Sequence, residues 1–399
     1  MVENPWLTIV GLGEDGPDGL APASQKAIDS AEVVIGPERH LSLLVDCNAE
    51  CIAWPIPFVD GIPKLLDHRG RNVVVLVSGD PFWFGAGSVL ARELESDEWR
   101  ALPAPSTFSL AAAKLGWPIE NTIQLGLHAA PYSRLRPHLG KSVKAVVTVR
   151  DGDAVSELAS WLNKCGFGET VLSVMESLGG PTERVRKNTA KDFNLSDVRH
   201  PVIVGLDVAG NGVRICQSGG LEDGLFDHDG QITKRPIRAL TLSALAPKPG
   251  EILWDLGAGS GSIAIEWLLS SPTTTAIAVE MNEERAKRIR SNADSLGVDR
   301  LEVIEGQLPE IVHELENPDV VFIGGGLSAE LVEVIWQKLQ PGTRVVANAV
   351  TLESESELAK AQEKYGGELM RIELAESNPL GSKRGWKSSY PIVQWSVIR

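Results

Sequence analysis

A glycine-rich turn between an apolar strand and an apolar helix constrains the fold of this chain more than any other feature. Trp254–Gly261 reads Trp-Asp-Leu-Gly-Ala-Gly-Ser-Gly, and Ser262–Leu269 follows with apolar residues at helical spacing. The three glycines let the backbone turn sharply and approach a ligand without Cβ clashes. The turn leads into a helix N-terminus, where free N–H groups favour a carboxylate. The pattern therefore predicts a ligand-binding α/β domain.

Three further residues fit a nucleoside-type ligand beside this turn. Glu280 ends the next predicted strand, at about the 20-residue spacing at which doubly wound sheets hold a ribose-binding acid. The third strand leads to Leu308, where an adenine edge could be recognised. Asp255 adds a negative charge suited to an ammonium group, so a ligand with carboxylate, ammonium and sulfonium charges fits. A dinucleotide site is less favoured, because its fingerprint is G-x-G-x-x-G and the glycines here alternate.

The second half of the chain resembles the class I S-adenosylmethionine methyltransferases. More narrowly, Ile232–Leu240 and Phe322–Gly326 resemble the decarboxylating methyltransferases of the cobalamin pathway that act at carbon 15 of the ring. The resemblance covers residues 230–399, although Gln307 stands where relatives often have Asp. Together, the residues and the resemblance imply that the cofactor S-adenosylmethionine contacts Thr233, Asp255, Gly257, Ala258, Gly259, Ser260, Gly261, Glu280, Gln307 and Leu308.

The first half carries G-x-G-x-x-G at Gly11–Gly16, but the residues after it do not fit a dinucleotide site. Pro17–Pro22 cannot start a helix packed against the loop, and we expect the helix to begin with Ser24 as its N-cap. Glu32, the acid near the required distance, precedes its strand instead of ending it. An NAD-dependent oxidoreductase built on this loop is therefore an alternative that the sequence disfavours.

Three strand-end loops of the first half favour another site. They resemble those of the class III tetrapyrrole methyltransferases, in which two α/β lobes hold the cofactor between them. Val34–Leu41 and Met175–Gly179 narrow the resemblance, over residues 6–208, to the branch that methylates carbon 5. Glu14 stands where many of those proteins have proline, and His40 is the histidine most worth testing. The resemblance implies cofactor contacts from Leu12, Ser78, Gly79, Asp80, Trp83, Ser106 and Thr107.

We therefore predict an α/β protein with two unlike domains. The first, over residues 1–210, has a bilobed class III tetrapyrrole methyltransferase fold. The second, over residues 230–399, is a Rossmann-like class I methyltransferase domain, and the glycine-rich residues 211–229 are a linker. Apolar runs predict largely parallel strands at Leu7–Val10, Val33–Ile35, Val73–Val77, Val143–Val149, Val171–Val174, Val202–Leu206, Ile252–Asp255, Ala276–Val279, Leu301–Ile304, Val320–Ile323, Arg344–Ala347, Glu368–Ile372 and Ile392–Ser396.

The chemistry implied by the two resemblances needs no protein nucleophile. A sulfonium methyl is already a strong electrophile, so transfer needs alignment and exclusion of water, and we name no catalytic residue. Methylation of carbon 15 leaves an electron-poor ring, which can accept the electron pair released when an acetate loses carbon dioxide. The implied substrate is a carboxylate-rich precorrin, with or without cobalt. Guanidinium and ammonium groups suit such carboxylates, and the basic candidates are Arg235, Arg238, Lys383 and Arg384.

Composition excludes several other classes of partner. The formal net charge of −15 argues against nucleic acid, whose phosphates need clustered Lys and Arg. No apolar run approaches the ~18 residues of a membrane span, and the acidic N-terminus does not read as a signal peptide. The four cysteines predict reduced thiols and no metal site. We therefore expect a cytoplasmic homo-oligomer that binds a tetrapyrrole, with a non-catalytic S-adenosylmethionine sensor as the other alternative.

Overall fold

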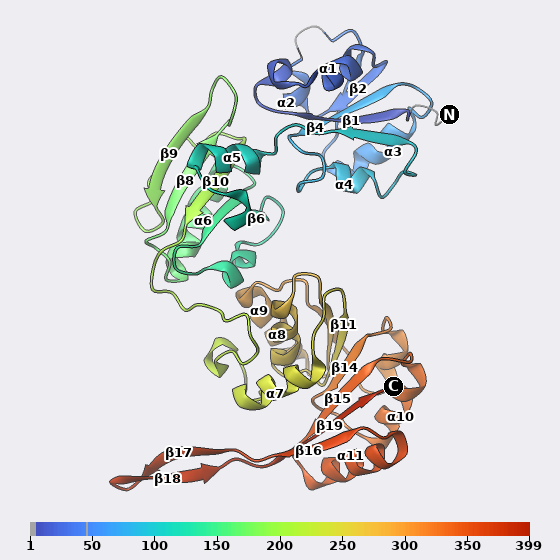
Figure 1. The fold of residues 1–399 in the computed structure, drawn as a ribbon, viewed down its shortest axis with the longest axis vertical. Coiled ribbons are helices and arrows are strands. Elements are labelled where there is room, and N and C mark those ends of the chain that lie inside the picture. The colour runs from blue at the N-terminus through green and yellow to red at the C-terminus, as the bar shows by residue number, and fades with distance from the viewer. Residues whose placement is uncertain (1–4, 45–46) are drawn as a thin grey trace. The chain divides into compact units, whose positions relative to one another are not determined.

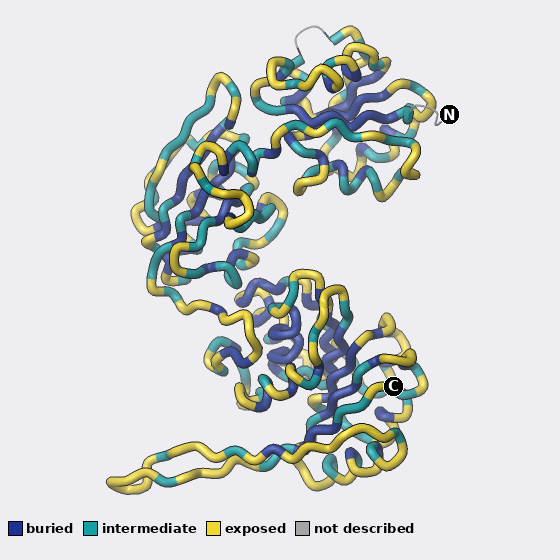
Figure 2. Tube along the Cα trace, viewed as in Figure 1, coloured by how far each residue is buried: buried dark blue, intermediate teal, exposed yellow. Residues whose placement is uncertain are grey.

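The computed structural model describes residues 5–44 and 47–399, and the chain divides into two compact units. The first unit contains residues 1–132 and 138–213, and the second contains residues 133–137 and 214–399. Both units are α/β structures with their own sheets and cores (Figure 1). The central strands of each main sheet are the most deeply buried part of the chain (Figure 2). No helix in the described ranges combines the length and apolarity that crossing a bilayer requires.

The first lobe of the first unit contains a five-stranded parallel sheet in the order β3-β2-β4-β1-β5. Its strands are β1 (Leu7–Leu12), β2 (Val33–Gly36), β3 (Glu50–Ala53), β4 (Val73–Ser78) and β5 (Trp99–Leu102). Its α-helices are α1 (Pro22–Asp29), α2 (Glu38–Leu41), α3 (Gly61–Leu66) and α4 (Gly87–Leu90). The expected N-cap at Ser24 is wrong, because α1 begins at Pro22, whose fixed φ suits a first helical turn, and Ser24 is buried.

The second lobe contains a mixed sheet in the order β6-β7-β10-β8-β9, in which only β6 and β7 pair in parallel. Its strands are β6 (Thr122–Gly126), β7 (Lys144–Thr148), β8 (Val171–Glu176), β9 (Arg184–Thr189) and β10 (Val202–Asp207). Its helices are α5 (Thr107–Leu115) and α6 (Gly152–Lys164). The expectation of largely parallel sheets is therefore wrong for this lobe, because β8, β9 and β10 follow one another without crossover helices.

The second unit contains a seven-stranded sheet in the order β13-β12-β11-β14-β15-β19-β16. Its strands are β11 (Ile252–Leu256), β12 (Thr275–Glu280), β13 (Glu302–Glu305), β14 (Val320–Ile323), β15 (Arg344–Ala349), β16 (Glu368–Ile372) and β19 (Ile392–Ile398). The pairs β15–β19 and β16–β19 are antiparallel, and the others are parallel. A two-stranded ribbon of β17 (Ala375–Leu380) and β18 (Lys383–Ser388) extends beyond this sheet (Figure 1).

Helices cover both faces of this sheet, as a doubly wound fold requires. The helices are α7 (Arg235–Leu245), α8 (Ser262–Ser270), α9 (Glu283–Leu296), α10 (Ala329–Lys338) and α11 (Leu352–Tyr365). Side chains of α7, α8 and α9 form one core with β11, and side chains of α10 and α11 form another. The strand order reverses between β11 and β14, which is the edge where doubly wound sheets bind ligands.

The segment that we predicted as a linker, residues 211–229, is part of the second unit from Arg214 onward. Leu221 and Phe226 are 2% and 4% exposed and pack in the core under α8. The buried carboxylate of Glu266 accepts hydrogen bonds from the backbone N–H groups of Gly220 and Leu221. The structure therefore corrects the linker prediction, because glycines here permit close packing on a helix as well as flexibility.

We expect a fragment of residues 214–399 to be markedly more stable than a fragment of residues 230–399. The shorter fragment loses the buried side chains of Ile215, Leu221 and Phe226 and leaves Glu266 with fewer partners. Burial of such side chains contributes on the order of 4 kcal/mol in total. Urea unfolding of both fragments measures the difference, and equal free energies of unfolding would contradict the packing described.

Candidate functional site

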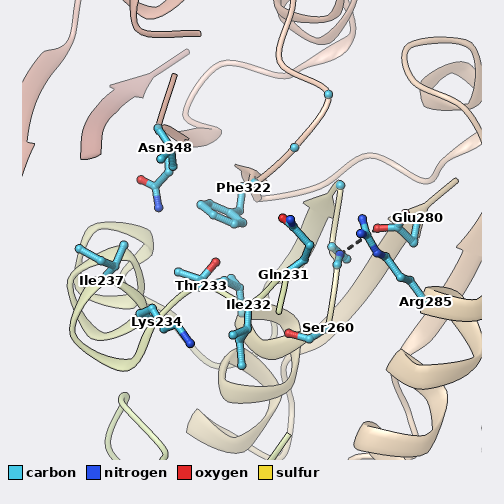
Figure 3. Close-up of a pocket in the computed structure, with 18 of the residues that line it drawn as sticks. Gln231, Ile232, Thr233, Lys234, Ile237, Ser260, Glu280, Arg285, Phe322 and Asn348 are labelled. Carbon is cyan, nitrogen blue, oxygen red and sulfur yellow. Dashed lines mark hydrogen bonds between the residues drawn. The ribbon is translucent and has the colours of Figure 1, made fainter. Parts of the chain in front are cut away.

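The second unit has a cavity of about 1110 Å³ at the carboxyl ends of its parallel strands (Figure 3). It lies where the strand order reverses, so the fold itself positions a ligand there. Most of the residues predicted to contact a cofactor line it: Thr233, Gly257, Ala258, Gly259, Ser260, Glu280, Gln307 and Leu308. Asp255 and Gly261 do not form part of the cavity wall.

The three glycines of the turn have φ values of +70°, +61° and +74° at Gly257, Gly259 and Gly261. They nevertheless serve different purposes. A Cβ on Gly257 would lie 2.6 Å from the Cα of Gly325, and one on Gly261 would meet Ile289 at 2.7 Å. A Cβ on Gly259 would have no neighbour closer than 3.6 Å. Gly257 and Gly261 therefore permit internal packing, whereas Gly259 leaves open space at the cavity wall.

Glu280 holds the glycine turn in place. Its Oε2 accepts a hydrogen bond from the Gly259 N–H at 2.9 Å, and its Oε1 accepts one from the Asn282 N–H at 3.0 Å. Each carboxylate oxygen has a further lone pair. The side chain lies on the cavity wall, so these free positions can accept hydrogen bonds from two neighbouring hydroxyls of a ligand.

Asp255 lies beneath the turn and is 1% exposed. Its Oδ2 accepts a hydrogen bond from the Ala264 N–H at 3.1 Å, and its Oδ1 has no partner among the described residues. Burial raises the pKa of Asp255 to about 7, and the negative charge of Glu280 adds to the rise. The carboxyl group fixes the start of α8. Its contact with a ligand ammonium stays a prediction.

The structure corrects the substrate role predicted for Arg238. Its side chain is fully buried, and its guanidinium pairs with the carboxylates of Glu266 and Asp223. It also donates to the backbone carbonyls of Leu221 and Thr233, so it has no free face for a ligand. Arg238 is a structural residue that joins the incoming segment to α7 and α8.

The other three basic candidates do not line the cavity. Arg235 is exposed and forms an ion pair with Glu222. Lys383 and Arg384 lie on the exposed ribbon, where Arg384 donates to Ser377 Oγ at 2.8 Å. The basic residues that line the cavity are instead Arg285 and Lys234, the neighbour of Arg235 in the same basic group of the sequence. Each of the two already forms an ion pair with an acid of the same unit: Lys234 with Asp223 and Arg285 with Asp229.

The first unit has a cavity of about 510 Å³ that both lobes line. It brings together all the residues predicted to contact a cofactor there: Leu12, Ser78, Gly79, Asp80, Trp83, Ser106 and Thr107. Gly79 has a φ of +56°, and its carbonyl oxygen would lie 1.8 Å from a Cβ on Gly11. Glycine at both positions is therefore needed for β1 and the loop after β4 to approach.

A polar network that the sequence did not predict lies at the edge of this cavity. Arg39 pairs with Glu14, and its Nη2 lies 2.8 Å from His40 Nε2. Ser78 Oγ lies 3.2 Å from the same nitrogen. Burial first, and the charge of Arg39 second, lower the pKa of His40 to about 4, so the imidazole is neutral at pH 7 and can accept a hydrogen bond from Arg39. Glu14 therefore has a partner of its own in Arg39.

Comparison with known proteins supports both halves of this description. Residues 6–194 match the family of tetrapyrrole (corrin/porphyrin) methylases, and residues 224–399 match the precorrin methyltransferase domain. A precorrin-6Y C(5,15)-methyltransferase [decarboxylating] of Sinorhizobium sp is 45% identical over 99% of this chain and 97% of its own. The chain belongs to this family of decarboxylating methyltransferases. The two-domain α/β fold expected from the sequence is thereby confirmed.

Two narrower similarities each cover less than half of the chain. A "probable cobalt-precorrin-6B C(15)-methyltransferase (decarboxylating)" of Saccharolobus solfataricus is 35% identical over 39% of this chain and 81% of its own. The solved C-terminal domain of the precorrin-6Y C5,15-methyltransferase of Rhodobacter capsulatus is 48% identical. It covers 46% of this chain and 100% of its own, with a TM-score of 0.45.

We expect Asp255 to make the stability of the second unit depend on pH. Its folded pKa of about 7 lies above the ordinary value of 3.8, so the contribution of its protonated form is complete below pH 4. That contribution is lost as the pH rises towards 7, by a few kcal/mol at most. Urea unfolding of residues 214–399 between pH 4 and 8 should show a smaller decline for Asp255→Asn. Parallel curves for the two proteins would contradict this assignment.

Removal of the Glu280 carboxylate should weaken cofactor binding in the second unit. Glu280→Ala removes the anchor of Gly259 and the two acceptor positions, at a cost of roughly 1.5–3 kcal/mol. Calorimetric titration of residues 214–399 with S-adenosylmethionine measures this cost. Glu302→Ala, an exposed site on β13, is the matched control and should bind normally. Normal affinity in the Glu280 variant would show that the ligand lies elsewhere.

Proposed function

We propose that this chain transfers methyl groups from S-adenosylmethionine to carbons 5 and 15 of precorrin-6Y and removes carbon dioxide from the ring C acetate, giving precorrin-8 in cobalamin biosynthesis. The observation that carries the proposal is the presence of two unlike cavities in one chain, each lined by residues predicted to contact a cofactor. The near full-length Sinorhizobium relative, whose name specifies both carbons and decarboxylation, supports it.

In the second unit, the chain's own residues bind and orient the methyl donor. The N–H groups at the start of α8 face a carboxylate, Glu280 accepts from ribose hydroxyls, and Leu308 packs against the adenine. S-adenosylmethionine, when bound, supplies an electrophilic methyl group. The chain then needs only to align the acceptor carbon with that methyl group and exclude water.

We assign carbon 15 and decarboxylation to the second unit and carbon 5 to the first. Two findings support this division: the precorrin methyltransferase domain matches residues 224–399, and the Saccharolobus solfataricus relative, which matches 39% of this chain, is named for carbon 15 and decarboxylation alone. Decarboxylation then occurs where the electron sink forms: the C–C bond to the carboxylate breaks, its electron pair enters the electron-poor ring, carbon dioxide leaves, and a proton from water converts the remaining CH2 into a methyl group. The same relative is named for a cobalt-precorrin, so a cobalt-containing substrate is the second candidate.

Product mass tests the proposal directly. Purified chain incubated with S-adenosylmethionine and either metal-free or cobalt-loaded precursor should give a product with two added methyl groups and one carbon dioxide lost. The precursor that turns over identifies the substrate. Analytical ultracentrifugation of the same sample tests the homo-oligomer, which stays a prediction, as does the cytoplasmic location.

Single substitutions should separate the two activities. Gly259→Val places a branched side chain at the wall of the second cavity and should abolish both carbon 15 methylation and decarboxylation, by more than ~100-fold. Asp80→Ala removes the carboxylate that accepts from the Phe82 N–H at 2.9 Å and should impair carbon 5 methylation alone. Product masses of the two variants measure both effects.

Matched controls accompany these variants. Gly250→Val also places a β-branched residue at a positive φ in the second unit, +84° against +61° at Gly259, but its Cβ meets no atom within 4 Å, so it should keep both activities. Asp67→Ala is the exposed counterpart in the first unit. Loss of carbon dioxide from the Gly259→Val chain without methylation at carbon 15 would overturn the proposed electron sink.

A further inference from the structure

The cavity of the second unit extends well beyond the glycine turn. Its 1110 Å³ exceeds the roughly 300–1000 Å³ of a site for one drug-sized ligand. Apart from Thr233, the residues predicted to contact the cofactor lie within or directly after β11, β12 and β13. The opposite end is formed by α7, β15, β16 and β19, and two strand spacings separate β11 from β15, or roughly 10 Å. A second molecule therefore has room beside the cofactor.

The walls of this opposite end are mainly apolar. Ile237, Val350, Ile372, Leu374 and Ile392 all line it. Flat conjugated rings bind well to such surfaces, because burial of their faces is favourable. Figure 3 shows Ile237 and Asn348 at one end of the cavity, with Glu280 and Arg285 at the other.

Asn348 is a fixed polar side chain at this apolar end. It lies directly opposite Gln394 in the antiparallel pairing of β15 and β19. Its Nδ2 donates to Thr241 Oγ1 at 2.9 Å, and its Oδ1 accepts from Gln394 Nε2 at 3.0 Å. Thr241 and Gln394 are 0% and 1% exposed, so buried groups on α7 and β19 determine the orientation of the amide.

The amide has unused hydrogen-bonding capacity. An asparagine side chain offers two N–H donors and two acceptor lone pairs, and the two bonds above use one of each. The remaining donor and acceptor belong to a half-buried group on the cavity wall. Polar groups that are held by buried partners and reach an apolar cavity are typical of ligand-orienting residues.

We propose that this end of the cavity is the tetrapyrrole subsite, and that the free N–H of Asn348 donates to a carboxylate side chain of the ring. This contact, which rests on the proposed function, positions the macrocycle relative to the cofactor end and thereby selects the carbon that is methylated. Asn348 is a substrate-binding residue in this arrangement, and Thr241 and Gln394 are positioning residues that act through it.

Two substitutions at one position test the subsite in the full chain. Asn348→Ala removes the donor and should raise the KM for the tetrapyrrole in carbon 15 methylation about 10-fold. Asn348→Asp keeps the size and the acceptor for Gln394 but places a negative charge opposite a carboxylate, so KM should rise about 100-fold. Asn317→Ala, an exposed asparagine in the same unit, is the matched control.

Three readouts separate substrate binding from a structural effect. The dissociation constant for S-adenosylmethionine at the second site should stay within about 2-fold, carbon 5 methylation should be unchanged, and the product of both variants should show any misplaced methyl group. A normal KM in both variants, or a cofactor constant that rises in step with KM, would overturn the subsite. Absence of carbon 15 methylation in the unaltered chain would instead contradict the proposed function.

Discussion

The buried ion pair between Arg238 and Glu266 is the interaction on which the second unit depends. Its two charges lie inside the core, where an unpaired charge would be strongly destabilising, so both must keep their partners. Glu266 accepts a hydrogen bond from the Leu221 N–H, and Arg238 donates one to the Thr233 carbonyl oxygen. The pair thereby connects the segment that enters the unit with Thr233, one of the residues that line the cavity. The cofactor contact predicted at Thr233 therefore depends on a charge pair that does not itself line the cavity.

The glycine turn and Glu280 could be predicted because they depend on local sequence. The structural role of Arg238 could not, because it depends on partners far away in the sequence. Positive φ and a strand-end acid follow from sequence spacing alone. The environment of Arg238 depends on Glu266, on the next helix, and on Asp223, in the supposed linker. The strands missed in the first unit have the same explanation, since β3, β5, β6 and β9 all lie at sheet edges and are only four to six residues long. An edge strand forms because a neighbouring strand offers hydrogen bonds to its backbone, and its own sequence pattern does not indicate that neighbour.

The two cavities fix their polar groups by different means. In the second unit, the carboxylate of Glu280 accepts hydrogen bonds from two backbone N–H groups, so the backbone holds this acid in position. In the first unit, side chains hold one another: Glu14 pairs with one nitrogen of the Arg39 guanidinium, and neutral His40 accepts a hydrogen bond from another. The first arrangement needs glycines, which a sequence displays. The second arrangement needs charged residues from separate loops, and these appear in the sequence only as isolated residues without a common motif.

Recognition of a carboxylate-rich ring by a chain of net charge −15 cannot depend on the overall field, which is repulsive. The basic residues near the cavities do not reverse this, because Arg39, Arg285 and Lys234 are each paired with an acid. Attraction must therefore come from contacts at short range: apolar walls against the ring faces and single hydrogen bonds from oriented groups. An amide such as that of Asn348 suits this need, because it donates to a carboxylate without a counter-charge and its direction is fixed before the ligand arrives. The orientation of the ring, which decides the carbon that meets the methyl group, then depends on the buried residues Thr241 and Gln394 that fix this amide.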